Sequence, residues 1–163
     1  MKSILSVLVE NKAGILARTA GLFARRGFNI ESLAVGETID PLISRMTIVV
    51  DGDQNIISQV EKQLNKQIDV IKVRNLAAED AVRREAALIK VRAGAQERGQ
   101  ITDIAAIMKA NVIDLSPATV TVEIIDTPER VRQLLDLLKP YSIVEMARTG
   151  MVALLKGAGG IGI

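Results

Sequence analysis

Residues 4–36 read ILSVLVENKAGILARTAGLFARRGFNIESLAVG, and this stretch passes from a strand pattern to a helix pattern and back. It predicts a strand, a helix and a second strand, at residues 3–9, 13–26 and 28–36. The helix prediction rests on an apolar face whose members lie about one turn apart, with Leu16, Ala20 and Phe23 on it. Gly27 follows two arginines and has the character of a helix C-terminal stop.

Two more strands and one more helix complete the first half of the chain. Alternating apolar residues predict strands at 43–50 and 69–75. Apolar residues one turn apart predict a helix at 54–65. The resulting order, β-α-β-β-α-β, is that of the split βαβ or ferredoxin-like unit, in which two helices cover one face of an antiparallel sheet.

The same order of patterns returns in the second half, although the residues themselves are not repeated. Strands are predicted at 87–93, 111–115, 119–125 and 142–148, and a helix is predicted at 99–109. A second helix starts at Pro128, capped by Thr127, and stops before Pro140. The sequence therefore predicts an α+β fold of two tandem ferredoxin-like βαββαβ units.

The domain boundaries are expected between these repeats. We assign residues 1–76 to the first unit, 77–84 to a polar, Ala-rich linker and 85–163 to the second unit. Four glycines within 156–163 predict a mobile tail. Each unit is small and has no disulfide to stabilise it, so we expect the chain to form a homodimer.

The composition argues against several classes of function. The chain has 21 basic and 19 acidic residues, so neither a basic arm nor an acidic tail is expected. It contains no Cys and no His, which excludes disulfides and thiolate chemistry and removes the usual general base near neutral pH. No apolar run approaches the roughly 20 residues of a membrane helix. We expect a cytoplasmic protein with no catalytic residues and no metal site.

The candidate ligand site is the turn between the first strand and the first helix. Gly14 leaves the backbone N–H groups of a helix N-terminus open, and these donors suit a small carboxylate. Asn11 and Asn29 carry amide groups that could meet the ammonium and carboxylate of an α-amino acid. Nearby apolar side chains would fit a small aliphatic ligand: Ile15, Leu16 and Ile30. The residues alone leave another interpretation open, in which Asn11 and Asn29 are turn residues and Gly14 only supplies backbone freedom.

A family resemblance narrows these alternatives. Residues 4–36, followed by SRMTIVV at 44–50, closely resemble the regulatory (small) subunit of acetolactate synthase, also called acetohydroxyacid synthase. The first half resembles the ACT domain of that family. REAALIKV at 84–91 and IVEMARTGMVALL at 143–155 resemble its C-terminal domain.

The resemblance implies a non-catalytic subunit that binds and activates a catalytic large subunit carrying thiamine diphosphate, Mg²⁺ and FAD. It also implies feedback inhibition by valine in branched-chain amino acid (valine, leucine and isoleucine) biosynthesis. Valine would bind between paired ACT domains, against Asn11, Ala13, Gly14, Ile15 and Leu16 of one subunit and Asn29 and Ile30 of the other. Ala13 stands where many relatives have Ser or Pro, so a hydroxyl contact is absent here.

Three other functions stay open at this point. An enzyme would need a nucleophile and a base, and no such pair is visible. An RNA-binding sheet needs exposed aromatic residues, and the chain has only two Phe and one Tyr. A free-standing ACT-type sensor, acting on another enzyme or regulator, would share the ligand site and differ in its partner.

The remaining charged residues of interest are expected to have structural roles. Arg45 is expected to be a surface charge. The carboxylates Glu123, Asp126 and Glu129 are expected to cap helix ends or to lie in solvent rather than to bind a metal.

Overall fold

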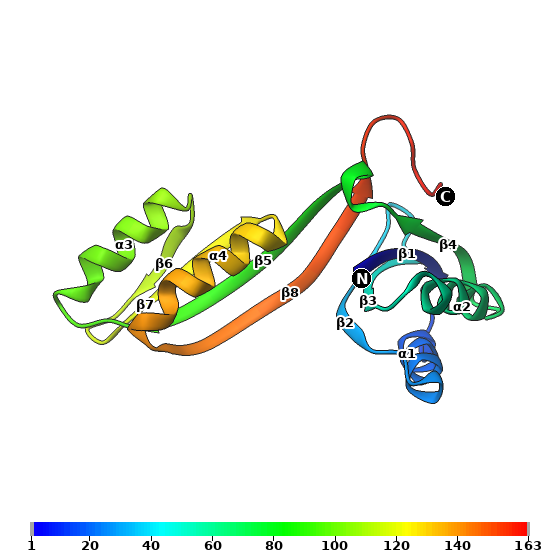
Figure 1. The fold of residues 1–163 in the computed structure, drawn as a ribbon, viewed down its shortest axis with the longest axis horizontal. Coiled ribbons are helices and arrows are strands. Elements are labelled where there is room, and N and C mark those ends of the chain that lie inside the picture. Colours follow the sequence, from blue (N-terminus) through cyan, green and yellow to red (C-terminus); the bar gives the residue numbers. More distant parts are fainter. Residues whose placement is uncertain (1, 163) are drawn as a thin grey trace. The chain divides into compact units, whose positions relative to one another are not determined.

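The computed structural model describes residues 2–162, and the chain divides into two compact units (Figure 1). Unit 1 takes residues up to 82 and those from 151 onward, whereas unit 2 takes residues 83–150. The element order and the two four-stranded sheets confirm the predicted α+β fold of two βαββαβ units.

Unit 1 contains the first sheet and two helices. Its elements are β1 (Lys2–Glu10), α1 (Ile15–Arg26), β2 (Ile30–Glu37), β3 (Ile43–Asp51), α2 (Gln54–Asn65) and β4 (Val70–Leu76). The strand order is β2-β3-β1-β4, and the pairs are antiparallel. The strands β2 and β4 therefore form the edges of the sheet, and β1 lies inside it.

The second sheet is built in the same order. Its elements are β5 (Ala81–Arg92), α3 (Glu97–Ile107), β6 (Asn111–Leu115), β7 (Thr119–Asp126), α4 (Pro128–Leu138) and β8 (Ile143–Leu155), with short 3₁₀ turns η1 (Ala78–Asp80) and η2 (Lys139–Tyr141). The strand order is β6-β7-β5-β8. Thr127 caps α4 by accepting from the Arg130 N–H, and Pro128 is the first helical residue, as predicted.

The strands β5 and β8 are longer than their sequence patterns indicate. Residues 81–84, within the segment assigned to a linker, form the first residues of β5, after η1. The strand β8 continues to Leu155 instead of ending near residue 148. The division between the two units falls within both strands.

The central strand β1 is buried on both faces of the sheet. Leu5, Val7 and Val9 pack against the core that α1 and α2 supply, which includes Phe23 and Leu64. Alternate residues of a strand point to opposite faces. The other face of β1 must therefore be covered by another part of the chain.

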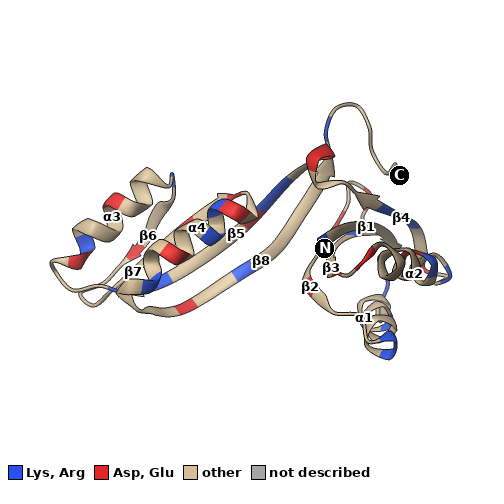
Figure 2. Cartoon of the chain, in the orientation of Figure 1, with Lys and Arg blue, Asp and Glu red and all other residues tan. Residues whose placement is uncertain are grey.

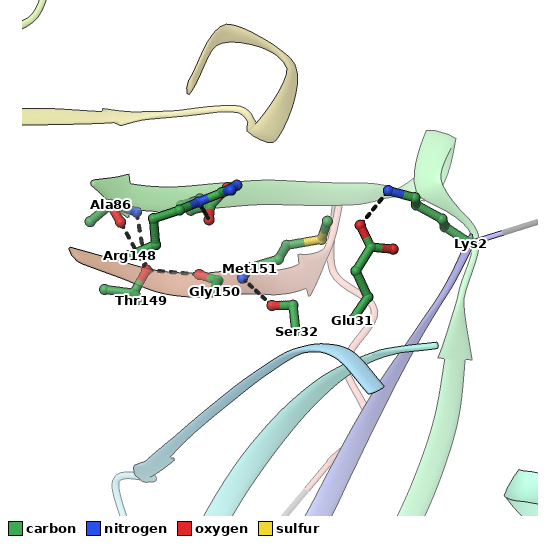
Figure 3. A network of polar contacts seen from close by, with 9 residues as sticks. Lys2, Glu31, Ser32, Ala86, Arg148, Thr149, Gly150 and Met151 are labelled. Carbon is green, nitrogen blue, oxygen red and sulfur yellow. Dashed lines mark hydrogen bonds and ion pairs between the residues drawn. The ribbon is translucent and has the colours of Figure 1, made fainter. Parts of the chain in front are cut away.

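The end of the chain provides that cover. Ile4 and Leu8 of β1 pack with Ala153 of β8 and with Ile161 of the tail. The Met151 N–H donates to Ser32 Oγ at 2.9 Å, which ties the last part of β8 to β2 (Figure 3). The prediction of a mobile tail is wrong for this part of the segment, because Ile161 is only 2% exposed and Arg74 donates to the Gly160 carbonyl.

Unit 2 has a separate aliphatic core beneath α3 and α4. Alternate residues of β5 and β7 face these helices, among them Ile89, Val91 and Val122. The buried carboxylate of Glu85 accepts two hydrogen bonds from the Arg148 guanidinium, at 2.7 and 2.8 Å. Figure 2 shows acidic and basic residues dispersed over the elements of both units rather than gathered into a basic or acidic face.

Removal of the Ile161 side chain should destabilise unit 1. Ile161→Ala would leave a cavity over β1 and lower the free energy of unfolding by about 2 kcal/mol, since the neighbouring side chains can partly collapse into the gap. Ile68→Ala is the matched control, because Ile68 is 95% exposed and its truncation should change stability by less than about 0.5 kcal/mol. Urea unfolding at equal protein concentration measures both, and equal effects would contradict the packed position of Ile161.

Candidate functional site

The turn 11–14 connects β1 to α1 and leaves the helix N-terminus uncapped. Gly14 is the N-cap residue, with φ +85° and ψ −8°, and no side chain accepts from the first turn of α1. That turn contains no acidic residue. The first N–H groups of a helix have no partner within it, so this end of α1 offers donors and a positive dipole to an anion.

Asn11 fastens this turn to the loop between β2 and β3. Its backbone N–H donates to the Leu42 carbonyl at 2.7 Å. Its side-chain Nδ2 donates to the Pro41 carbonyl at 2.8 Å and to Glu37 Oε1 at 3.2 Å. The amide nitrogen is therefore engaged within the protein, and Oδ1 is the atom of Asn11 best suited to accept from an ammonium group.

The apolar residues at this turn differ in where their side chains point. The Ile15 side chain is 4% exposed and belongs to the core of unit 1, so only its backbone is available to a ligand. Leu16 is 48% exposed, and Ala13 is exposed as well. Leu16 is thus the apolar side chain that this turn can offer to a ligand.

Asn29 and Ile30 lie at the other end of α1. Gly27 ends the helix in the left-handed conformation, exposed Asn29 follows, and half-buried Ile30 begins β2. The helix has 12 residues. At 1.5 Å per residue it separates its two ends by about 18 Å. One chain therefore does not bring Asn29 to the turn at Gly14, and the seven predicted site residues stay a prediction.

Two ion pairs flank the turn. The hydrogen bond and negative charge of Glu10 raise the pKa of the exposed Lys12 ammonium group. Arg18, one turn into α1, donates to Asp69 Oδ2 at 2.6 Å. Both cations near the helix N-terminus are thus already paired with carboxylates.

The three carboxylates that the sequence singled out in the second unit are also paired, with cations or with an amide. Asp126 binds Arg130 at 2.6 Å and Glu129 binds Arg83 at 2.9 Å, while Glu123 accepts from an amide. Burial opposes ionisation of Asp126, but hydrogen bonds from the Thr127 N–H and from Arg130 lower the pKa of its carboxyl. Among residues 2–162, no group of three or more His, Cys, Asp or Glu side chains is arranged to hold a metal ion.

Arg45 differs from its expected role as a surface charge. Its side chain has no hydrogen bond or ion pair with another described residue, and its Nε is buried. Burial lowers the pKa of its guanidinium group. The sequence gives little indication that Arg45 is partly buried. Its burial can be inferred only when the face of β3 that carries it is known to be covered.

Two protein families match the two halves of the chain. Residues 5–72 match the AHAS small subunit-like ACT domain, and residues 84–157 match the small subunit of acetolactate synthase. The acetolactate synthase small subunit of Mycolicibacterium smegmatis is 51% identical over 158 residues, which are 97% of this chain and 93% of that protein. The chain belongs to the acetolactate synthase small-subunit family.

Other members of the small-subunit family agree over nearly the whole length. The probable acetolactate synthase small subunit of Archaeoglobus fulgidus is 49% identical and aligns over 96% of this chain and 98% of its own. The crystal structure of the acetolactate synthase small subunit from Thermotoga maritima has a TM-score of 0.90 at 39% identity, covering 98% of this chain and 99% of that one. The resemblance inferred from the sequence is therefore confirmed.

Membership of the small-subunit family, with an ACT domain in the first half, supports a regulatory rather than a catalytic role. No helix within residues 2–162 is long and apolar enough to cross a membrane.

Alanine substitutions at two glycines should have opposite effects on stability. At Gly14 the positive φ strains an L-residue, and the added Cβ would lie 3.3 Å from the Arg18 guanidinium, so Gly14→Ala should cost about 1–2 kcal/mol. At Gly21, inside the same helix, the added Cβ would also lie 3.3 Å from an arginine, Arg25, but the backbone there is helical and the exposed Arg25 side chain can move. Gly21→Ala should therefore stabilise by about 0.5–1 kcal/mol, because it removes backbone entropy from the unfolded chain. Urea unfolding of both variants checks the left-handed turn, and a stabilising Gly14→Ala would contradict it.

Proposed function

We propose that this chain is the regulatory subunit of acetolactate synthase, that it activates the catalytic large subunit, and that it confers feedback inhibition by valine. Valine would bind at an interface between two ACT domains. The uncapped N-terminus of α1 at Gly14 is the observation that carries the proposal. The Ile15 N–H donates to the Lys12 carbonyl at 3.5 Å, and the N–H groups that follow it in the first turn suit the ligand carboxylate. Asn11 Oδ1 suits the ammonium group, and half-exposed Leu16 suits an aliphatic side chain.

The distance along α1 implies that a second copy completes this site. Asn29 lies about 18 Å from the Gly14 turn of its own chain, which is too far for one small amino acid to touch both. The edge strand β2 has no partner on one side among the described residues, and a second β2 is a natural one.

Antiparallel pairing of two β2 strands would set Ile30 of one copy opposite Glu37 of the other. Glu37 is the residue that accepts from Asn11, so that pairing carries Asn29 of the second copy toward the Asn11 turn. The proposed site then takes Asn11, Ala13, Gly14, Leu16 and the backbone of Ile15 from one subunit, and Asn29 and Ile30 from the other.

A ligand held between two subunits can regulate by favouring one dimer arrangement. The ligand can shift the equilibrium between an open and a closed dimer only by the difference in its binding free energy for the two arrangements. That difference sets the upper limit of its effect on the large subunit. The chemistry would belong to the large subunit, with its thiamine diphosphate, Mg²⁺ and FAD. The sequence-based domain boundaries 1–76, 77–84 and 85–163, which differ from the two compact units of the structure, and the cytoplasmic location remain part of this proposal.

The alternative is a free-standing ACT-type sensor that acts on another enzyme or regulator. It would share the ligand site but leave acetolactate synthase unaffected. An assay of acetolactate formation by the large subunit, with and without this chain, separates the two functions and sets the baseline for the next experiment.

Gly14→Asp should abolish valine inhibition and leave activation intact. The new carboxylate would lie where the carboxylate of valine binds, and like charges there repel. Gly14→Asn is the matched control, since Asn has the same shape, no charge and good tolerance of a positive φ. Acetolactate formation is measured at increasing valine, and valine inhibition that survives in Gly14→Asp would show that the site lies elsewhere.

The chain should sediment as a homodimer at micromolar concentration, and Val35→Asp should convert it to a monomer. Val35 is a half-exposed residue of the β2 edge, and a carboxylate at this position would lose solvent when two β2 strands pair, with no cation opposite it to compensate. Val35→Thr keeps the shape without charge and should stay dimeric. Analytical ultracentrifugation measures all three proteins, and a stable folded wild-type monomer would contradict the dimer.

A further inference from the structure

The second face of the unit 1 sheet contains two adjoining cavities, and none of the seven predicted valine-site residues lines either of them. Their volumes are about 250 and 360 Å³. Three residues line both of them, namely Arg45, Ala153 and Leu154. Met46 and Ile48 face the helices, so Arg45 projects from β3 to the opposite side, under the end of β8. Arg45 is thus the cation common to both cavities.

Arg45 is short of partners at this position. No described residue forms a hydrogen bond or ion pair with its side chain, and its Nε is buried. A guanidinium group has five N–H donors and stays protonated, so a partly desolvated one favours a bound anion. Its planar fork matches a carboxylate, which it can bind through two parallel hydrogen bonds.

A second unpartnered polar group lies in the smaller cavity. Ser6 of β1 is 0% exposed, and its Oγ has no hydrogen-bond partner among the described residues. In the β1–β3 pairing Ser6 lies opposite Thr47, two residues from Arg45, so the Ser6 and Arg45 side chains share one face of the sheet. A buried hydroxyl without a partner is unfavourable, and a ligand oxygen would relieve it.

The glycine-rich tail forms one wall of the smaller cavity. Gly157, Gly159 and Gly160 line it, and Ile161 closes it. The tail is held there by Arg74, which donates to the Gly160 carbonyl, and by the Lys156 N–H, which donates to the Asp80 carbonyl. A wall without side chains lets a ligand approach backbone N–H groups closely.

The remaining walls are apolar and favour an aliphatic body over a sugar or a phosphate ester. Leu76 and Leu155 line the smaller cavity, while Val82 and Val152 line the larger. Glu37 also lines the larger cavity and brings a negative charge there, so the ligand carboxylate is assigned to the smaller cavity, whose lining contains no acidic side chain. A single cation among aliphatic walls suits a ligand with one negative charge and a small hydrocarbon part.

We propose that these cavities form a second ligand site, which binds a small aliphatic carboxylate with its carboxylate group on Arg45 and Ser6. The site is separate from the turn at Gly14 and does not depend on the proposed valine site. Its ligand is a monocarboxylate that needs no ammonium group, because no acidic side chain lines the smaller cavity beside Arg45 and Ser6.

The test is a titration of the isotope-labelled full chain, followed by NMR, with isovalerate and with its neutral analogue isovaleramide. Isovalerate should shift the backbone signals of Ser6 and of residues 157–161 and the Arg45 Nε–H signal, and isovaleramide should not. Arg45→Met, which keeps the aliphatic stem, should weaken isovalerate binding by about tenfold to a hundredfold. Arg26→Met is the matched control with the same loss of charge on an exposed residue of α1, and it should bind as the wild type does.

Two further variants keep the outcome decisive. Ser6→Ala should weaken isovalerate binding by a smaller factor, and it replaces Arg45→Met if that variant does not fold. Gly14→Asp should lose its response to valine and still bind isovalerate, which separates this site from the valine site. Equal shifts with the acid and the amide, shifts at other residues only, or unchanged binding in Arg45→Met would overturn the proposal and leave cavities that hold water alone.

Discussion

The burial of β1 on both faces is the constraint on which unit 1 depends. The side chains on one face of β1 are buried by α1 and α2, and the alternate side chains must be buried by a second layer on the other face. The chain supplies that layer from residues beyond 150, which belong to unit 1 although the whole of unit 2 lies between them in the sequence. A strand covered on one side only would expose Ile4 and Leu8 to water, at a cost of about 1.5–3 kcal/mol for each side chain.

The candidate ligand site follows from how β1 ends. The strand stops at Glu10, Asn11 fastens the turn to the β2–β3 loop, and Gly14 lets the chain enter α1 through a left-handed residue. The helix then carries the chain away from the turn before Asn29 appears. A site that needs both ends of α1 cannot be closed by one copy, so the proposed dimer would serve recognition as well as stability. This is a physical reason for a sensor of this kind to respond through its quaternary structure.

Local patterns were sufficient to predict much of the fold. Period-two alternation located β3 and β7, and the Thr127-Pro128 pair located the start of α4 within a residue. The start of α1 at Ile15, rather than at 13, depends on the backbone conformation of Gly14, which a sequence pattern does not reveal. The tail was misjudged for a different reason: its glycines indicate flexibility, whereas the position of Ile161 is set by contacts with residues far away in the sequence. The same long-range cover decides the environment of Arg45, so its partly buried position could not be predicted from SRMTIVV alone.

The return of the last residues to β1 has a consequence for how the protein is made. A ribosome releases the first sheet and its two helices long before it synthesises residues 151–162, so one apolar face of the new sheet stays uncovered while all of unit 2 is produced. Partly covered sheets of this kind are prone to aggregate. The order of synthesis therefore makes unit 1 the last to be finished, although it is the first to be started.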